Sequence, residues 1–478
     1  MGKIIESKIT QFNGGMVNDR RSTDTRYAAV VKHFDIKTRP HALVPYRSFE
    51  DGDSSSSTQK IVNIIPVGST LYGLGVVSGT ARVKVFTKTD LSNATWTTPG
   101  NGESASRTRQ EDVFVYYRKV NKVFGLHGGD QAWSHTVGGA AFSETAQAIA
   151  YTNAAQGLVH SKDDVYYQPY DNKIATNNND SWTAAALTLP SDIIITSIFE
   201  QGNYLGIACR SQQSAGKSRV YLWDRDSSVA TLSENIDFGT GDLMVAEEMD
   251  GGILGISRLG SSSEIFNPKV IFRYWSGGSG ARIIKEMECD VSGTFSLGIE
   301  KQKNNGTLYF SLTITQNGTQ NLGVWAVCTS SDGLSVWLDR VSTAAPDNFL
   351  IHGNYAFIPS SSGATMEKSD DQANFTTTSA YESLIFNLGD SAIYKDLVRA
   401  SVMFEPLPAN GQVVFKYRVN AETSYTTLFT HTTDDAIAQS VVTDLPKHFR
   451  EIQFRIESTG GAVITGFKFQ AELIDKDL

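Results

Sequence analysis

Apolar runs of the kind that form β-strands recur along this chain about every 40 to 55 residues, from near Ile61 to near Pro359. Each unit begins with an apolar run, reverses at a turn rich in Gly, Asn and Asp, and continues with a second apolar run. A Trp usually follows near the outer end of the unit. This period is typical of a β-propeller, in which one blade is a four-stranded sheet of roughly 40 to 50 residues.

The sequence predicts six clear blades and a weaker seventh, so a six- or seven-bladed propeller is expected. A large β-sandwich with coincidental spacing is the alternative, and the recurring Trp favours the propeller. The predicted blade cores begin at Ile61, Glu111, Ala148, Asp192, Leu243, Thr294 and Asn348.

The regions on either side of the repeats differ from them in character. Residues 1–55 are irregular and polar and predict an N-terminal arm. Residues 56–378 hold the propeller. Residues 379–478 contain alternating runs such as VVFKYRV and FREIQFRIES, which predict a C-terminal β-sandwich. The expected fold class is therefore all-β, because helical periodicity is scarce throughout.

Composition narrows the class of protein. The 478 residues carry 51 Asp plus Glu against 42 Lys plus Arg, a formal charge of −9. That balance argues against tight binding of nucleic acid through its phosphates. No segment has the apolar length needed to cross a bilayer, and the start lacks the apolar region of a secretory signal. The three cysteines are far apart and predict free thiols rather than a zinc site.

Sialidases are the propeller enzymes that this chain most nearly suggests. Their Asp box, S-x-D-x-G-x-T-W, is approached by TSSDGLSVW (Thr329 to Trp337), although Gly follows Asp332 directly and Val336 replaces the Thr. The Asp box is a structural turn, so this match would support a fold rather than an activity.

No constellation for catalysis or metal binding stands out. A glycosidase needs two carboxylates at a defined separation. Adjacent acids such as Glu247 and Glu248 point to opposite faces of a strand and read as solvated turns. The segments Asp224–Ser228 and Glu50–Asp53 resemble calcium loops but lack the full ligand set. We therefore expect no catalytic, cofactor-binding or metal-binding residues, no cofactor and no enzymatic activity.

The order of parts carries a resemblance to a known family. FNGGMVND (Phe12 to Asp19) and FDIKTRPHALVPYRS (Phe34 to Ser48) precede the blades, and SLIFNLGDSAIYKDL and VFKYRVN follow them. This arrangement resembles β-propeller proteins of bacteriophage tails, especially the nozzle or tail-hub proteins of short-tailed phages. The resemblance implies a structural protein that forms a ring, usually a hexamer, below the portal and adaptor and around the DNA exit channel. This chain is shorter than the larger nozzle proteins.

The leading hypothesis is therefore a virion tail component that forms the nozzle or hub ring. Its expected partners are copies of itself, the portal or adaptor protein, and tail fibre or spike proteins. DNA would pass through without specific binding, and no membrane insertion is expected. A glycan- or receptor-binding propeller is the alternative, and a sialidase-like glycosidase is the third hypothesis.

The sequence leads to three structural expectations. Trp223 and Trp275 end similar strand runs and should occupy equivalent, largely buried positions in neighbouring blades. Residues 1–49 should lie on the propeller or on a neighbouring subunit. The ring lumen should be acidic or neutral, with Arg20, Arg21 and Arg26 directed towards protein partners.

Overall fold

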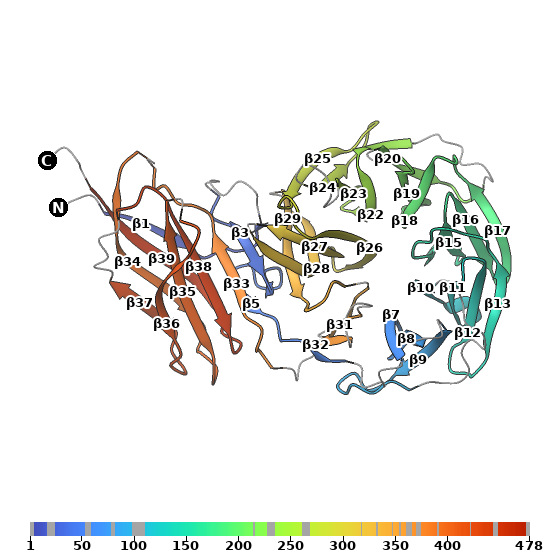
Figure 1. Cartoon of the computed structure of the whole chain (residues 1–478), viewed down its shortest axis with the longest axis horizontal. Helices are drawn as coiled ribbons and strands as arrows, with labels where there is room; N and C mark the ends of the chain where they lie inside the picture. The colour runs from blue at the N-terminus through green and yellow to red at the C-terminus, as the bar shows by residue number, and fades with distance from the viewer. Residues whose placement is uncertain are drawn as a thin grey trace. The chain divides into compact units, whose positions relative to one another are not determined.

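The protein divides into two compact units, and both consist mainly of β-strands (Figure 1). Unit 1 consists of residues 1–49, 325–341 and 372–478, and unit 2 consists of residues 50–324 and 342–371. The computed structural model describes residues 4–16, 24–52, 59–77, 82–97, 110–213, 216–226, 235–260, 268–316, 318–330, 333–346, 348–352, 355–359, 366–369, 374–389, 392–420, 422–442 and 448–474.

Unit 2 is a β-propeller whose sheets follow one another around a ring (Figure 1). Within each of the first six sheets, the strands neighbour one another in chain order. The first three sheets are β7 (Gln59–Val67), β8 (Thr70–Val77) and β9 (Arg82–Lys88); β10 (Gln110–Tyr117), β11 (Lys122–His127), β12 (Gln131–Thr136) and β13 (Phe142–Ala148); and β14 (Leu158–Val159), β15 (Tyr166–Tyr170), β16 (Lys173–Asn178) and β17 (Ser181–Thr188).

The fourth and fifth blades are complete four-stranded sheets, and the sixth crosses the division between the units. That division falls inside β28, between residues 324 and 325. These sheets are β18 (Ile193–Gln201), β19 (Tyr204–Ser211), β20 (Lys217–Trp223) and β21 (Asn235–Thr240); β22 (Asp242–Met249), β23 (Gly252–Leu259), β24 (Lys269–Trp275) and β25 (Arg282–Glu288); and β26 (Phe295–Asn304), β27 (Thr307–Gln316) and β28 (Thr319–Ser330), followed in strand order by β29 (Gly333–Val341).

A seventh blade closes the ring with strands from both ends of unit 2. It contains β30 (Leu350–His352), β31 (Tyr355–Ile358) and β32 (Glu367–Ser369), and its fourth strand is β6 (Glu50–Asp51). Apolar side chains of this blade pack with those of the first blade in one buried cluster that includes Phe86 and Phe357. The number of blades is therefore seven. The seven repeats predicted from the sequence correspond, in order, to these blades.

The repeated Trp residues are less regular than the sequence pattern predicts. Trp223 and Trp275 do end the third strands of neighbouring blades and pair with Leu205 and Ile253, the second residues of β19 and β23. Trp223 is fully buried, whereas Trp275 is only half-buried. Trp182 instead lies in the fourth strand of its blade. An indole side chain can pack between blades at several depths. The strand period is therefore a stronger indication of a blade than the position of the Trp.

Unit 1 contains a sandwich of two β-sheets. One sheet has the order β1 (Ile4–Ile9), β39 (Ile464–Leu473), β34 (Lys395–Phe404) and β37 (Ala438–Val442). The other runs from β29 through β3 (Tyr27–Lys32), β33 (Ser379–Ser383), β38 (Ile452–Thr459) and β35 (Gln412–Val419) to β36 (Thr426–His431). Phe454 of one sheet packs against Phe469 of the other, with 4.7 Å between ring centroids. Aromatic side chains thus fill the space between the sheets, as in other β-sandwiches.

The N-terminal segment is part of this sandwich rather than a separate arm. Strand β1 pairs with β39, and β3 pairs with β33. The Phe12 ring lies 5.2 Å from the Tyr381 ring in an edge-to-face contact. The end of the arm predicted for residues 1–55 belongs to the propeller, because β6 joins the seventh blade. The run YAAVVK in β3 is a short apolar strand. The sequence did not predict it because the residues on either side are irregular and polar.

Candidate functional site

A pocket of about 740 Å³, lined by both charged and apolar residues, lies on the inner side of the propeller. Its walls come from the third to the sixth blades, including the innermost strands β18, β22 and β26, which face the inside of the ring in Figure 1. Four consecutive blades therefore contribute to one cavity. Its volume lies within the range of small-molecule sites, roughly 300–1,000 Å³. We call this cavity the inner pocket.

The charged residues of the inner pocket occupy corresponding places in successive repeats. Glu200, Glu247 and Glu248 come shortly before the turn that ends the first strand of their blades, and Lys301 and Lys303 do the same in the sixth blade. These turns use left-handed backbone, as at Gly202 (φ 60°), where a side chain would be strained. Because equivalent ends of the blades converge in a propeller, charges that are about 50 residues apart in the chain come together.

Lys301 connects three blades at the pocket wall. Its ammonium donates to the Ile198 carbonyl oxygen at 3.0 Å, to the Ala246 carbonyl oxygen, and to Glu247 Oε2 at 2.7 Å. Both side chains of the Lys301–Glu247 pair are only 15% exposed. Burial lowers the pKa of Lys301, and the Glu247 carboxylate opposes that shift. The lysine ties β26 to β18 and β22.

Lys303 forms a second and more exposed pair on the same strand. Its ammonium donates to Glu248 Oε2 at 2.6 Å, and the Gly251 N–H donates to Glu248 Oε1 at 2.8 Å. Burial acts to raise the pKa of Glu248, but these two hydrogen bonds outweigh it and hold the pKa below its usual value. Glu248 is therefore ionised at neutral pH.

The third blade supplies a loop that closes one side of the pocket. The Ser161 N–H and hydroxyl each donate to Glu200, at 2.6 Å. Arg225 pairs with Asp163 of the same loop and donates to the Asn203 carbonyl oxygen at 2.9 Å. Tyr167 also donates to Asp163, at 2.8 Å. The loop is thus held by Glu200 and Arg225 of the fourth blade and by Tyr167 of its own blade.

Two glutamines join neighbouring blades in the same manner. The Gln156 side chain accepts from the Phe114 N–H at 3.3 Å and donates to the Phe114 carbonyl oxygen at 2.6 Å. Gln302 makes the matching pair with Ile351, at 2.7 Å and 2.6 Å. Each side-chain amide completes hydrogen bonds of an adjacent strand as a backbone amide would. These contacts hold the inner strands of the second and third blades, and of the sixth and seventh, in fixed positions.

The structure revises the interpretation of the acidic pairs. Glu247 and Glu248 were read as solvated turns, yet both line the inner pocket and each bonds a different lysine. The missed signal is the recurrence of charges just before the first turn of successive repeats, in FEQGN, AEEMDGG and IEKQKNNG. A single repeat does not carry it, because the partners lie 54 and 55 residues apart.

The other sequence candidates are only partly described. No group of three or more His, Cys, Asp or Glu residues is placed to hold a metal ion among these residues. Asp332 of the Asp-box-like turn, and Asp53, Ser227 and Ser228 of the calcium-like loops, lie outside the described residues. Cys209 is a buried free thiol, and burial raises its pKa. Within the described segments, no helix has the length and apolar character to span a membrane.

The arginines of the N-terminal segment are only partly described. Arg20 and Arg21 lie outside the described residues. Arg26 forms an ion pair of 2.7 Å with Asp24, two residues away.

Comparisons with known proteins identify similar folds. No protein-family model and no curated protein matches the sequence. Among solved structures, one described as "Glycoside hydrolase" is 11% identical, with a TM-score of 0.33 over 88% of this chain and 99% of that one. The Neurospora crassa Pan2 WD40 domain is 10% identical, with a TM-score of 0.41 over 67% and 95%. Trypanosoma rangeli sialidase in complex with sialic acid is 10% identical, with a TM-score of 0.33 over 98% and 96%.

These comparisons correct one prediction from the sequence. Because it lacks known catalytic motifs, the sequence predicts that the chain is not an enzyme. That prediction does not stand, because proteins named as glycoside hydrolases and as a sialidase are among the solved structures similar to this chain. At 10–11% identity the comparisons describe the fold alone. The all-β, β-propeller architecture of this chain follows from its own strands and sheet order.

Proposed function

We propose that this protein is a structural component of a bacteriophage tail, forming a nozzle or hub ring around the DNA exit channel. The observation that carries the proposal is the order of parts along the chain. N-terminal strands lead into a closed seven-bladed propeller, and the chain then returns to complete a β-sandwich. This order agrees with the resemblance of the sequence to tail nozzle and hub proteins.

The segments that carry the resemblance also have a structural role that supports the proposal. In the segment beginning at Phe12, a Cβ atom on Gly15 would lie 2.8 Å from the Val336 backbone nitrogen, so the close approach of β2 (Gly15–Met16) to β29 requires glycine. In the segment Phe34–Ser48, Tyr46 donates to the buried Asp339 carboxylate at 2.9 Å. Both segments therefore pack against β29, which also belongs to unit 1.

The proposed ring accounts for the composition of the chain. DNA that leaves a capsid must move freely, and each phosphate paired with Lys or Arg adds salt-dependent binding. A chain with 51 acidic and 42 basic residues can supply an acidic or neutral lumen. The partners in this proposal are further copies of the chain in a ring of about six, which closes through a heterologous interface, together with portal or adaptor and fibre or spike proteins.

Electron microscopy of the intact particle tests the proposal. We expect this chain in mass spectra of purified virions and a closed ring of its density on the tail axis. Salt dependence gives an independent measurement, because the purified ring should bind duplex DNA weakly even at about 50 mM salt. Density confined to a peripheral fibre, or a protein absent from the virion, would contradict the proposal.

A glycan-binding propeller is the second candidate, and the inner pocket is the observation that favours it. Its walls combine carboxylates, ammonium groups and backbone, which can bond hydroxyl groups. Among the described residues that line the pocket, the one aromatic side chain is Phe199, and it is buried. A glycan array with the purified full chain tests this candidate, and either no binding or binding that survives mutation of the pocket would contradict a glycan site in the inner pocket.

A further inference from the structure

The charges of the inner pocket do not all pair with one another. Six charged side chains line it, and four of them form the Lys301–Glu247 and Lys303–Glu248 pairs. The other two are Glu200 and Lys162. Among the residues that the structure describes, neither of these forms an ion pair with the other or with any other residue. One anion and one cation therefore remain unneutralised in the same cavity.

These two groups share one wall of the pocket. Ser161 donates its N–H and hydroxyl to Glu200, both at 2.6 Å, which fixes the orientation of the carboxylate. Lys162 is the next residue, and consecutive Cα atoms are about 3.8 Å apart. Its own N–H donates to His160 Nδ1 at 3.2 Å, and the His160 side chain is completely buried. The backbone that carries Lys162 is thus held in place, while its side chain is exposed.

The Glu200 carboxylate keeps capacity for a ligand. Each of its two oxygens accepts one hydrogen bond from Ser161, and an ionised carboxylate offers about four acceptor positions. Leu158, Ile198 and Ile299 add apolar surface to the same cavity. The pocket therefore combines an acceptor for an ammonium group, a donor for a carboxylate, and apolar lining residues.

We propose that the inner pocket binds a small zwitterionic ligand, with its ammonium group at Glu200 and its carboxylate at Lys162. The chemical class is a molecule with one free amine and one free carboxylate, such as a short peptide with both termini free or an amino sugar acid. The other four charged residues line the pocket but do not bind the ligand in this proposal, because Lys301 and Lys303 are already neutralised by Glu247 and Glu248. This binding does not depend on the proposed role in a tail.

A series of tripeptides tests the proposal by titration calorimetry or NMR with the full chain. Triglycine carries both charges, acetyl-triglycine only the carboxylate, and triglycine amide only the ammonium. We expect triglycine to bind about tenfold more tightly than either relative, since each charge-assisted contact at a partly exposed site contributes on that scale. Neuraminic acid is an amino sugar acid. Comparing its affinity with that of triglycine shows whether the pocket prefers an amino sugar acid or a short peptide.

Two variants assign each charge to its residue. Lys162→Gln should weaken triglycine about tenfold and leave triglycine amide unchanged. Glu200→Gln should weaken triglycine and leave acetyl-triglycine unchanged. Lys173→Gln, on the third strand β16 of the same blade, is the matched control and should change nothing.

Three outcomes would overturn the proposal. Triglycine and neuraminic acid could both fail to bind at millimolar concentration. Lys162→Gln could leave the affinity for triglycine unchanged, and because this side chain is exposed, the variant is expected to fold. Maltotriose, which is neutral, could bind as tightly as the charged probes, which would favour glycan binding instead.

Discussion

Replacing Lys301 should destabilise the propeller more than replacing any other lysine of the inner pocket. Its ammonium bonds two backbone carbonyl groups and Glu247, and the pair is only 15% exposed on each side. Lys301→Met keeps most of the aliphatic stem but leaves the Glu247 carboxylate without its partner. Breaking a buried ion pair on one side typically costs about 3–5 kcal/mol. Some water reaches this pocket, so we expect a loss of about 3 kcal/mol.

Equilibrium unfolding in urea, followed by tryptophan fluorescence, measures this loss. Lys303→Met is the matched control, because it removes a lysine two residues away from a pair whose side chains are 34% and 28% exposed. Exposed pairs contribute roughly 0–1 kcal/mol, so this variant should be nearly neutral. The two lysines differ in burial rather than in chemistry, which isolates the effect of the buried position.

A double variant separates the ion pair from the carbonyl contacts. Glu247→Gln combined with Lys301→Met removes both charges of this pair, so neither partner is left as an uncompensated ion. We expect it to recover about 1 kcal/mol or more relative to Lys301→Met alone. The reasoning is refuted if Lys301→Met costs less than about 1 kcal/mol, or if the two substitutions are additive.

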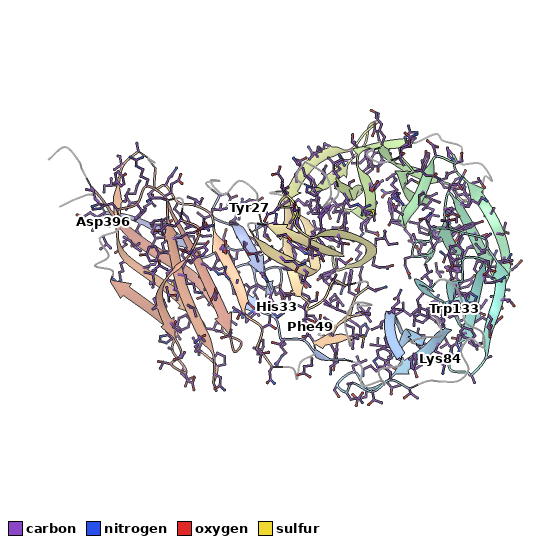
Figure 2. All side chains as sticks on the ribbon, viewed as in Figure 1. Tyr27, His33, Phe49, Lys84, Trp133 and Asp396 are labelled. Atoms are coloured by element: carbon purple, nitrogen blue, oxygen red, sulfur yellow. The ribbon has the colours of Figure 1, made fainter. Side chains whose placement is uncertain are left out.

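Three further predictions concern other parts of the molecule. Trp223→Ala should lower the free energy of unfolding by about 3–5 kcal/mol, whereas Trp275→Ala should lower it by roughly 1–2 kcal/mol because its ring is half-buried. Equal losses for the two variants in urea unfolding would contradict this prediction. Burial and the Arg340 charge lower the pKa of His33 (Figure 2) from 6.5 to about 3, so the unfolded chain binds the extra proton and stability falls as the pH drops below about 6.5. His33→Asn, which tolerates the φ of 62°, should flatten that decline, and an unchanged pH profile would argue against it. Arg225→Gln should speed hydrogen exchange of residues 160–165, because it removes the contacts of Arg225 with Asp163 and with the Asn203 carbonyl oxygen. Unaltered exchange would show that the bonds of Ser161 and Tyr167 are sufficient to hold the loop.

Strand recurrence made the propeller predictable. An inner strand packed on both faces needs a continuous apolar run, and the turns between strands need residues that tolerate left-handed backbone. Both requirements are local and can be read from segments such as DIIITSIFEQGNYLGIACR. The alternation in VVFKYRV similarly predicted a sandwich strand, and Val413, Phe415, Tyr417 and Val419 of β35 are all buried.

The inner pocket could not be predicted in the same way. Its ion pairs join Glu247 to Lys301 and Glu248 to Lys303, across 54 and 55 residues. On a single strand these residues look like ordinary charges beside a turn. Only closure of the ring brings equivalent turns to one cavity, where solvent is limited and a charge needs a partner.

The same distinction applies to the ends of the chain. Local patterns were sufficient to establish that the chain forms short strands and that the repeats succeed one another, because period, turn chemistry and apolar content act over a few residues. Long-range packing determined that β6 completes the seventh blade and that β1 and β3 join the sandwich. Backbone hydrogen bonds of an edge strand accept almost any sequence, so the choice of neighbour depends on which edges and apolar faces remain uncovered once the whole chain has folded.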